Sequence, residues 1–381
     1  MMKKQRVIIL LLLLPLLGGC WGSNEIQSLA YVTAIGLDYA DGNYKAYVQI
    51  LNFANVARRE SGEPGKNIPA WIGRGEGTTV LEAFADLYGT SQLRLFWGHV
   101  SAIVVSESII KLDKLREVAD TLNRSREIRY NIHVYGTKEN LSDVLSVKSL
   151  VNFSPLESLL ARPIKYYSQR PYIVPLHGFK FLAAMNEPGY SAYLPSLAID
   201  KRSWSEDKRL KPMFRVSGAY FFNDKHYAGW ISEEDLIGAR WFNKRLDIES
   251  VNVPIKGKPT AVVNLYGLKY RIQPIVQGSD VTFVISIRLK GNIGGAWIDT
   301  HDKHLESLAE AGVREEVLAT FETCVRNKID VYRLSEQLYR DNPNAFKRLM
   351  KSKPFPLNHN SLTRVDVHID IEHSGKYKGK K

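Results

Sequence analysis

The sequence is poor in cysteine, with two in 381 residues, Cys20 and Cys324. Two cysteines allow one intramolecular disulfide at most, and none when Cys20 is modified, so a disulfide-stapled fold is excluded. Long apolar runs are also missing after Cys20, where no stretch reaches the roughly 18 to 20 residues that a membrane-spanning helix needs. The part of the chain beyond Cys20 therefore reads as a body outside the bilayer.

Patterns of catalytic residues are absent as well. The sequence contains no G-x-S-x-G, no glycine-rich phosphate loop, no H-E-x-x-H and no paired C-x-x-C. His301 and His304 form an H-x-x-H pair that could bind a metal, but a polar first turn of a helix is the simpler interpretation. His99, beside Phe96 and Trp97, is either a titrating or ligand-binding group or a histidine fixed at a strand edge. We predict a protein that is not an enzyme, with no catalytic residue, no metal and no cofactor.

Basic residues outnumber acidic ones, 52 to 40, for a net charge of +12. A cationic surface suits nucleic acid, an anionic membrane or an acidic partner, and charge alone does not choose among them. The aromatic residues are spread over strand-like segments at a period of two, as in a core, so we expect no nucleic-acid partner. The charge-dense stretch "DKRSWSEDKRLK", 200–211, is typical of an exposed loop or linker. Cys324, in "VLATFETCVRNKI", is predicted to be a buried small hydrophobe.

The N-terminus has the order of a bacterial lipoprotein signal. A cationic segment at 1–6 precedes the eleven-residue apolar run Val7–Leu17, which is too short to span a membrane. Leu17-Gly18-Gly19-Cys20 then resembles a lipobox, in which a peptidase cuts before the cysteine and its sulfur takes a diacylglycerol. Residues 1–19 would be removed, and Cys20 would become an N-palmitoyl, S-diacylglycerol cysteine. The alternative is a plain secretory signal with Cys20 merely near the cleavage site.

The rest of the chain is long enough for two or three domains. Its pattern predicts an α+β protein with mixed and antiparallel sheets and covering helices in two to three successive domains. We expect an N-terminal α/β region over 20–205, possessing two subdomains, a C-terminal α+β domain over 206–375, and a basic tail at 376–381 with four lysines. Whether that tail meets the membrane stays open.

The first half predicts helices that cover one face of a mixed sheet. Asp41-Gly42-Asn43 is a hairpin signal between two strands within 29–53. A polar, glycine-rich and proline-rich stretch at 57–77 reads as a loop, and Thr79 with Glu82 forms a capping box for a helix over 79–89. Further strands are expected at 99–106 and 129–136, with Asp113 as the N-cap of a helix between them.

The second half predicts strands followed by one long helix and a last strand. Two hairpins are expected, around 223–225 and around 277–280, and the helix runs from 302 to about 340. A final strand is expected over 364–373. This order is typical of a helix laid on a mainly antiparallel sheet.

Several ordered segments resemble one known family. They are Cys20 with nearby Glu25, "VTAIGLDY" at 32–39, "GTTVLEAFADL" at 77–87, "RLFWGHVSAIVVSE" at 94–107, "SREIRYNIHVYGT" at 125–137, "VSGAYFFNDKHYAGWIS" at 216–232 and "NKIDVYRLSEQLYRDNP" at 327–343. Together they resemble the Ger(x)C family, the C-subunit lipoproteins of spore nutrient germinant receptors. The chain departs from the family at Arg333-Leu334-Ser335, where an aromatic-glycine turn is usual.

The resemblance implies a lipid-anchored, non-catalytic subunit required for nutrient-triggered spore germination. It implies assembly with membrane-embedded A-type and B-type receptor subunits, on the outer face of the cytoplasmic membrane, which is the spore inner membrane. It also implies three α+β domains, and it assigns one site residue, Cys20. The alternative function is a solute-binding lipoprotein of a nutrient transporter. The sequence does not identify the nutrient, direct nutrient binding, the partner-binding face or the stoichiometry.

Overall fold

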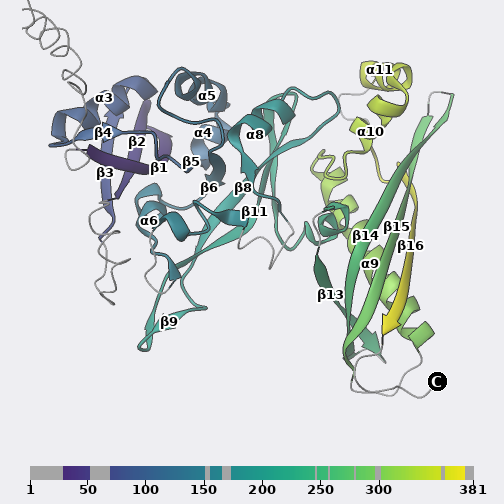
Figure 1. The fold of residues 1–381 in the computed structure, drawn as a ribbon. Coiled ribbons are helices and arrows are strands. Elements are labelled where there is room, and N and C mark those ends of the chain that lie inside the picture. Colours follow the sequence, from purple (N-terminus) through teal and green to yellow (C-terminus); the bar gives the residue numbers. More distant parts are fainter. Residues whose placement is uncertain are drawn as a thin grey trace, which may run out of the picture.

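The computed structural model (Figure 1) describes residues 29–51, 69–150, 155–164, 173–244, 247–255, 258–278, 280–296, 302–352 and 357–373. Two sheets dominate it. One has ten strands and the other has four, and a two-stranded hairpin projects from the first. The predicted α+β class, with mixed sheets and covering helices, is confirmed.

The ten-stranded sheet has the path β12-β11-β8-β6-β5-β1-β2-β3, with β4 paired to β1 and β7 to β6. Its strands are β1 (Leu29–Ala40), β2 (Asn43–Leu51), β3 (Trp71–Gly77), β4 (Arg94–Phe96), β5 (Ala102–Ser106), β6 (His133–Thr137), β7 (Leu176–His177), β8 (Ala192–Asp200), β11 (Met213–Asn223) and β12 (His226–Ser232). The predicted hairpin between β1 and β2 is confirmed, with Asp41 and Gly42 at positive φ in the turn.

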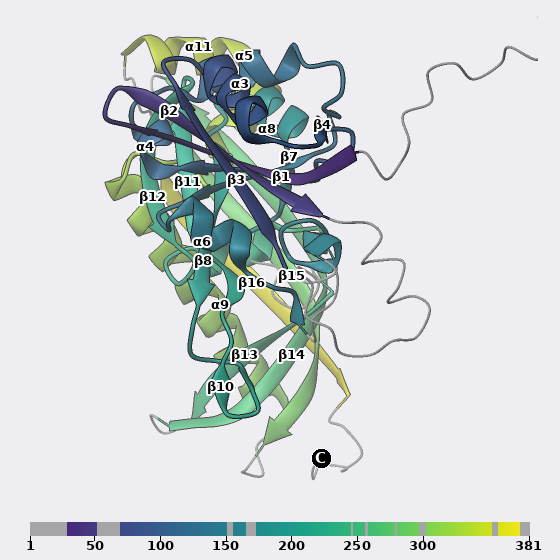
Figure 2. The same cartoon turned by 90° about the vertical axis from the view of Figure 1, so that its left-hand side faces the viewer.

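Helices lie on both faces of this sheet, so the expectation of one covered face is wrong. The helices are α3 (Val80–Thr90), α4 (Glu107–Lys111), α5 (Leu115–Asn123), α6 (Leu141–Ser146) and α8 (Gly178–Ala184). Four of them share one core with alternate strand residues such as Ile35 and Val48. Helix α6 packs on the opposite face, against Ala34 and Val104 (Figure 2). Because the central strands β1 and β5 are buried on both faces, each face of the sheet needs a cover.

Residues 71–77 form the edge strand β3, although we predicted a loop over 57–77. Gly73, Gly75 and Gly77 alternate along it and face α3, so the glycines that suggested a loop make room for a helix. A Cβ on Gly75 would lie 2.2 Å from the backbone oxygen of Ala83. Helix α3 itself begins as predicted, with the Glu82 amide donating to Thr79 Oγ1 at 3.1 Å. The rest of the predicted loop, 57–68, lies outside the described residues.

We predicted that Asp113 caps the helix that follows it, but it does not cap α5. The N-cap position is Lys114, which makes no side-chain capping bond. Asp113 has φ +54°, and its carboxylate instead accepts from the Tyr227 amide at 3.2 Å and contacts His226 Nδ1 at 3.0 Å. A turn that favours an aspartate in left-handed conformation therefore joins α4 and α5 and anchors β12.

The first sheet extends beyond residue 205, where the sequence placed a domain boundary. Strand β11 pairs antiparallel with β8, and β12 pairs with β11, through the predicted turn at 223–225. Between β8 and β11, the charge-dense stretch forms a small hairpin of β9 (Ser205–Glu206) and β10 (Arg209–Leu210).

The second sheet has the order β13-β14-β15-β16, with the last pair parallel. Its strands are β13 (Ile248–Ile255), β14 (Lys258–Gln277), β15 (Asp280–Ala296) and β16 (Leu362–His373). The predicted β14–β15 hairpin is confirmed. Phe283, Ile285, Ile287 and Leu289 are buried on one face of β15, against α9 (Asp302–Arg326). A short 3-10 helix, η5 (Ile237–Phe242), packs beside α9.

The predicted helix over 302–340 is interrupted after Arg326. Lys328 takes φ +55°, and the Ile329 and Lys328 amides donate back to the Cys324 and Val325 carbonyls. This is a Schellman ending, which closes α9. Two shorter helices follow, α10 (Leu334–Asp341) and α11 (Pro343–Ser352).

The outer edge of β16 is bonded to side chains of α9. The Glu306 and Glu310 carboxylates accept from the Ile371 and Ile369 amides at 3.0 Å each. One turn further along α9, Arg314 Nε donates to a β16 carbonyl at 3.0 Å. Helix side chains thus occupy backbone groups that a fifth strand would otherwise use.

Candidate functional site: the joint between the two sheets

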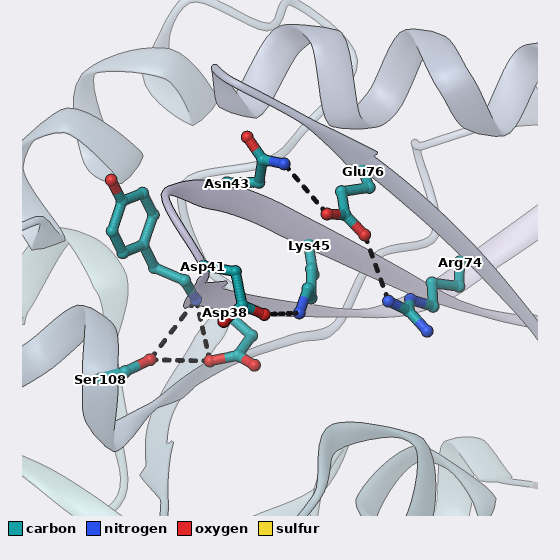
Figure 3. A network of polar contacts seen from close by, with 8 residues as sticks. Asp38, Asp41, Asn43, Lys45, Arg74, Glu76 and Ser108 are labelled. Atoms are coloured by element: carbon teal, nitrogen blue, oxygen red, sulfur yellow. Dashed lines mark hydrogen bonds and ion pairs between the residues drawn. The ribbon is translucent and has the colours of Figure 1, made fainter.

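The segments of the first half that resemble the family come together in neighbouring strands. "VTAIGLDY" lies in β1, which pairs in parallel with β5, and β5 pairs in parallel with β6. At the end of β1, Asp38 Oδ1 accepts from Ser108 Oγ at 2.7 Å and from the Tyr39 amide at 2.8 Å (Figure 3). The carboxylate therefore fixes the start of α4 against the end of β1.

A second polar group lies at the turn of the β1–β2 hairpin and on the neighbouring strand β3 (Figure 3). Lys45 pairs with Asp41 at 3.3 Å, and Arg74 pairs with Glu76 at 3.2 Å. Because these pairs are solvent-exposed at one or both ends, each contributes little stability. They do not converge on a common point that would hold a ligand.

The segments of the second half meet at a joint between the two sheets. Ser191 Oγ donates to Asn223 Oδ1 at 2.7 Å, and Asn223 Nδ2 donates to the Lys328 carbonyl at 2.6 Å. The Asp330 amide donates to Ser191 Oγ at 3.0 Å. One chain of hydrogen bonds thereby connects β8 and β11 of the first sheet to the turn after α9.

Asp330 lies at the centre of this joint, 4% exposed. Its two carboxylate oxygens accept from the Leu334 amide at 3.0 Å and the Ser335 amide at 2.7 Å, which are the first amides of α10. Burial raises the pKa of Asp330 above its usual range, and the two amide bonds oppose that rise. We predicted no role for Asp330 from its sequence. An aspartate a few residues ahead of a helical run is a signal that would have identified the cap.

Arg333 follows Asp330 in a left-handed conformation, with φ +59°. This is the departure from the family pattern noted above, and glycine adopts such a conformation at lower cost. Arg333 donates to Tyr190 Oη at 2.7 Å, and its guanidinium lies 4.4 Å from the Tyr190 ring centre. These contacts to the first half of the chain offset the strain and add a second connection across the joint.

A cavity of about 370 Å³ opens beside these residues. It is lined by aromatic and polar side chains from both halves, among them Tyr193, Phe242, Tyr270, Tyr332 and Lys244. Phe242 packs between Tyr270 and Tyr332, with ring centres 5.2 and 4.2 Å away. The lining therefore offers aromatic rings together with a few polar groups, among them Ser191 and Lys244.

A second cavity, of about 300 Å³, lies in the first half between α5 and α8. Apolar residues dominate its lining, including Val118, Leu122, Phe181 and Leu182. Arg129 is the one charged residue among those that line it.

Cys324 is buried beside the joint, 1% exposed, as predicted. It packs with Ala219, Phe221 and Ile329. Burial raises the pKa of the thiol, which keeps it protonated and unreactive.

The candidate histidines do not form a site among the described residues. His99 lies against the rings of Tyr31 and Phe96, at 5.3 and 5.8 Å, and burial with nearby Arg129 lowers its pKa. His304 is exposed on the first turn of α9, and its predicted partner His301 lies outside the described residues. No three histidine, cysteine or acidic side chains in the described ranges gather as a metal centre would require.

Two buried polar clusters were not predicted from the sequence. Arg240, 3% exposed, pairs with Glu249 at 2.8 Å and Glu316 at 2.7 Å, and so connects η5, β13 and α9. In the first half, His133 stacks on His177 with ring centres 4.2 Å apart. Burial and the neighbouring ring lower the pKa of His133 to about 4. Single charged or histidine residues far apart in the sequence give no signal that they will meet.

Cys20 and the lysines of the tail lie outside the described residues, so their predicted roles stay predictions. Within the ranges that the structure covers, no helix is long and apolar enough to cross a membrane.

Comparisons with known proteins agree along most of the chain. Residues 22–199 match the profile described as "Spore germination protein N-terminal domain", and residues 217–375 match "Spore germination B3/ GerAC like, C-terminal". Spore germination protein KC of Bacillus subtilis (strain 168) is 24% identical over 364 residues, covering 90% of this chain and 88% of that protein. Spore germination protein YndF of the same organism is 23% identical, covering 98% and 97%.

A solved structure has the same fold. The crystal structure of the GerBC protein superposes with a TM-score of 0.55 at 15% identity, over 91% of this chain and all of that one. At this identity the likeness concerns the fold alone.

Proposed function

The chain belongs to the Ger(x)C family of spore germination proteins, and we propose that it is the lipid-anchored, non-catalytic subunit of a nutrient germinant receptor. In this role it is held by Cys20 on the outer face of the spore inner membrane. There it assembles with membrane-embedded subunits of the A and B types. The observation that carries the proposal is the match of both family profiles to one chain whose first 20 residues resemble a lipoprotein signal.

The chemistry of the N-terminus supports the anchor. Cys20 directly follows two glycines, which allow a peptidase close to the backbone, and it ends an apolar run of signal-peptide length. Acyl chains bury many methylene groups at about 0.8 kcal/mol each, so a diacylglycerol holds a protein of this size firmly. The buried Cys324 does not compete for the modification, because its thiol is inaccessible.

The joint supports an assembly role. Its hydrogen bonds make one body of two unlike sheets, and neither cavity combines a nucleophile with a base. A solute-binding lipoprotein of a transporter, the alternative, usually closes two similar α/β lobes over a ligand. Here one half has a ten-stranded mixed sheet and the other a four-stranded one, which favours the receptor subunit.

The anchor is tested by replacing Cys20 with alanine and growing cells on labelled palmitate. The Cys20→Ala protein should keep its signal segment and take up no label. The matched control, Cys324→Ala, removes the other cysteine and should be cleaved and labelled normally. Label entering the Cys20→Ala protein would show that the lipobox interpretation is wrong.

The receptor role is tested in spores that lack the gene and all related receptor operons except its own. Such spores should form normally but fail to lose optical density when nutrients are added. Expression of the intact gene should restore the response, whereas the Cys20→Ala gene should restore it poorly. Germination of the deleted strain at the normal rate on every nutrient mixture would contradict the proposal.

A further inference from the structure

The hairpin β9–β10 extends the β8–β11 ribbon away from the body of the first sheet. Asp200 at the end of β8 pairs with Met213 at the start of β11, so residues 201–212 lie beyond the last paired position. In Figures 1 and 2 the hairpin points to the end of the molecule opposite α3 and α5. Every residue from 201 to 210 is exposed.

Two apolar side chains lie on this projecting hairpin. Trp204 is 51% exposed and Leu210 is 64% exposed. Backbone bonds fix their positions, since the Lys211 amide donates to the Trp204 carbonyl at 2.8 Å and Leu210 pairs with Ser205. Large apolar side chains on a protruding two-stranded ribbon are not stabilised by burial in a core of their own chain.

Basic side chains surround these two residues. Lys201, Arg202, Lys208 and Arg209 make no ion pair with any carboxylate that the structure describes, while Lys211 pairs with Glu206 at 2.5 Å. The Asp200 carboxylate at the base is used within the loop, where it accepts from the Arg202 amide at 2.8 Å. Residues 200–211 contain five basic side chains and three acidic ones, Asp200, Glu206 and Asp207 in the turn. The hairpin therefore presents a net positive charge beside an exposed tryptophan.

We propose that the β9–β10 hairpin docks on an anionic lipid bilayer, with Trp204 and Leu210 at the headgroup level and the four unpaired cations on lipid phosphates. Tryptophan favours the membrane interface, because its ring is apolar and its N–H is polar. Lysine and arginine near an anionic leaflet are attracted electrostatically, and their aliphatic stems can follow the apolar residues.

This inference rests on the proposed function in one respect, because the Cys20 anchor is what holds the hairpin within reach of a membrane. The hairpin then adds a second point of attachment and restricts how the tethered body is oriented. An acidic partner protein is the competing occupant, and the experiment below separates the two by using lipid alone.

The experiment uses the mature, lipidated chain in vesicles of phosphatidylcholine, with or without one quarter phosphatidylglycerol. Ser205→Cys supplies one accessible thiol, since Cys324 is buried, and it is labelled with an environment-sensitive dye. A dye on Ala319→Cys, an exposed position of α9, is the matched control. Emission from position 205 should shift to the blue in anionic vesicles only, and high salt should reverse the shift; emission from position 319 should not change.

Substitutions then test the named side chains. Lys201→Gln with Arg209→Gln should weaken docking roughly 25-fold, as two interfacial cations are lost. Arg116→Gln in α5 with Arg124→Gln at its C-cap removes the same charge elsewhere and should leave docking unchanged. Trp204→Ala should reduce the dye response, whereas Trp71→Ala, which removes another exposed tryptophan, should not.

The outcomes distinguish the two proposals. Failure of the protein to float with either kind of vesicle would refute the anchor. Flotation with both kinds, but with no shift at position 205 or with equal shifts at 205 and 319, would refute the docking hairpin and leave the anchor intact.

Discussion

Replacing Asp330 with alanine should destabilise the protein by roughly 2 to 6 kcal/mol, because two buried amides each lose their acceptor at about 1 to 3 kcal/mol. The two amides belong to Leu334 and Ser335 at the start of α10. Asp330 is only 4% exposed, so solvent water does not readily replace its carboxylate as their acceptor. Asp330→Asn keeps one acceptor oxygen and should cost about half as much. The affected region connects the halves, so the loss should also loosen the joint.

Urea unfolding followed by far-UV circular dichroism measures this cost. Asp341→Ala is the matched control, since Asp341 is exposed and accepts a single side-chain bond from Gln337 at 3.0 Å. That control should change the free energy of unfolding by less than about 0.5 kcal/mol. If Asp330→Ala were as stable as Asp341→Ala, the carboxylate would not be the cap that holds α10 at the joint, and our account of the joint would be refuted.

Three further predictions concern other parts of the molecule. Folding lowers the pKa of His133 from 6.5 to about 4, so the folded state takes up this proton less readily than the unfolded state, and the free energy of unfolding should fall by up to about 3 kcal/mol as the pH drops from 6.5 to 4. His133→Gln should flatten that part of the pH profile of stability, measured by urea unfolding. An unchanged profile would show that His133 is not the cause. Arg240→Met leaves two glutamates without their buried cation and should lower the free energy of unfolding by about 3 to 5 kcal/mol in the same assay. The control Arg364→Met, at an exposed ion pair, should lower it by about 0 to 1 kcal/mol, and equal losses of stability would contradict the buried network. Gly75→Val should displace α3, because its Cβ would lie 2.2 Å from a backbone oxygen of that helix, and normal amide-exchange protection of α3 would contradict the close packing.

The sequence predicted the parts of the fold that depend on neighbours along the chain. The β1–β2 and β14–β15 hairpins follow from turn residues between alternating strands, and the α3 cap follows from Thr79. It failed where a distant element decides the outcome. Gly73, Gly75 and Gly77 look like loop residues until α3 is placed against them, and Asp113 looks like a cap until β12 lies beside it.

The candidate site depended even more on distant contacts. Ser191 lies 32 residues from Asn223 and 139 residues from Asp330 along the chain. Their hydrogen bonds exist only after both sheets have formed. The family was nevertheless predicted from the same segments, because their order persists even where their structural roles are not evident. Arg333 illustrates the difference. The sequence shows that it departs from the family pattern, but only the structure shows its left-handed backbone and its contact with Tyr190.

The carboxylates that α9 places along β16 have a consequence for the lipid-anchored state that we propose, in which copies of the protein share one membrane. A free strand edge invites pairing with a strand from another copy, and a tether confines copies to two dimensions where they meet often. Glu306 and Glu310 already occupy the Ile371 and Ile369 amides, and Arg314 occupies a carbonyl of the same strand. An incoming strand would have to displace charged side chains before it gained any backbone bond. In the proposed anchored state, neighbouring copies can therefore stay separate folding units, because this strand edge is already occupied within each copy.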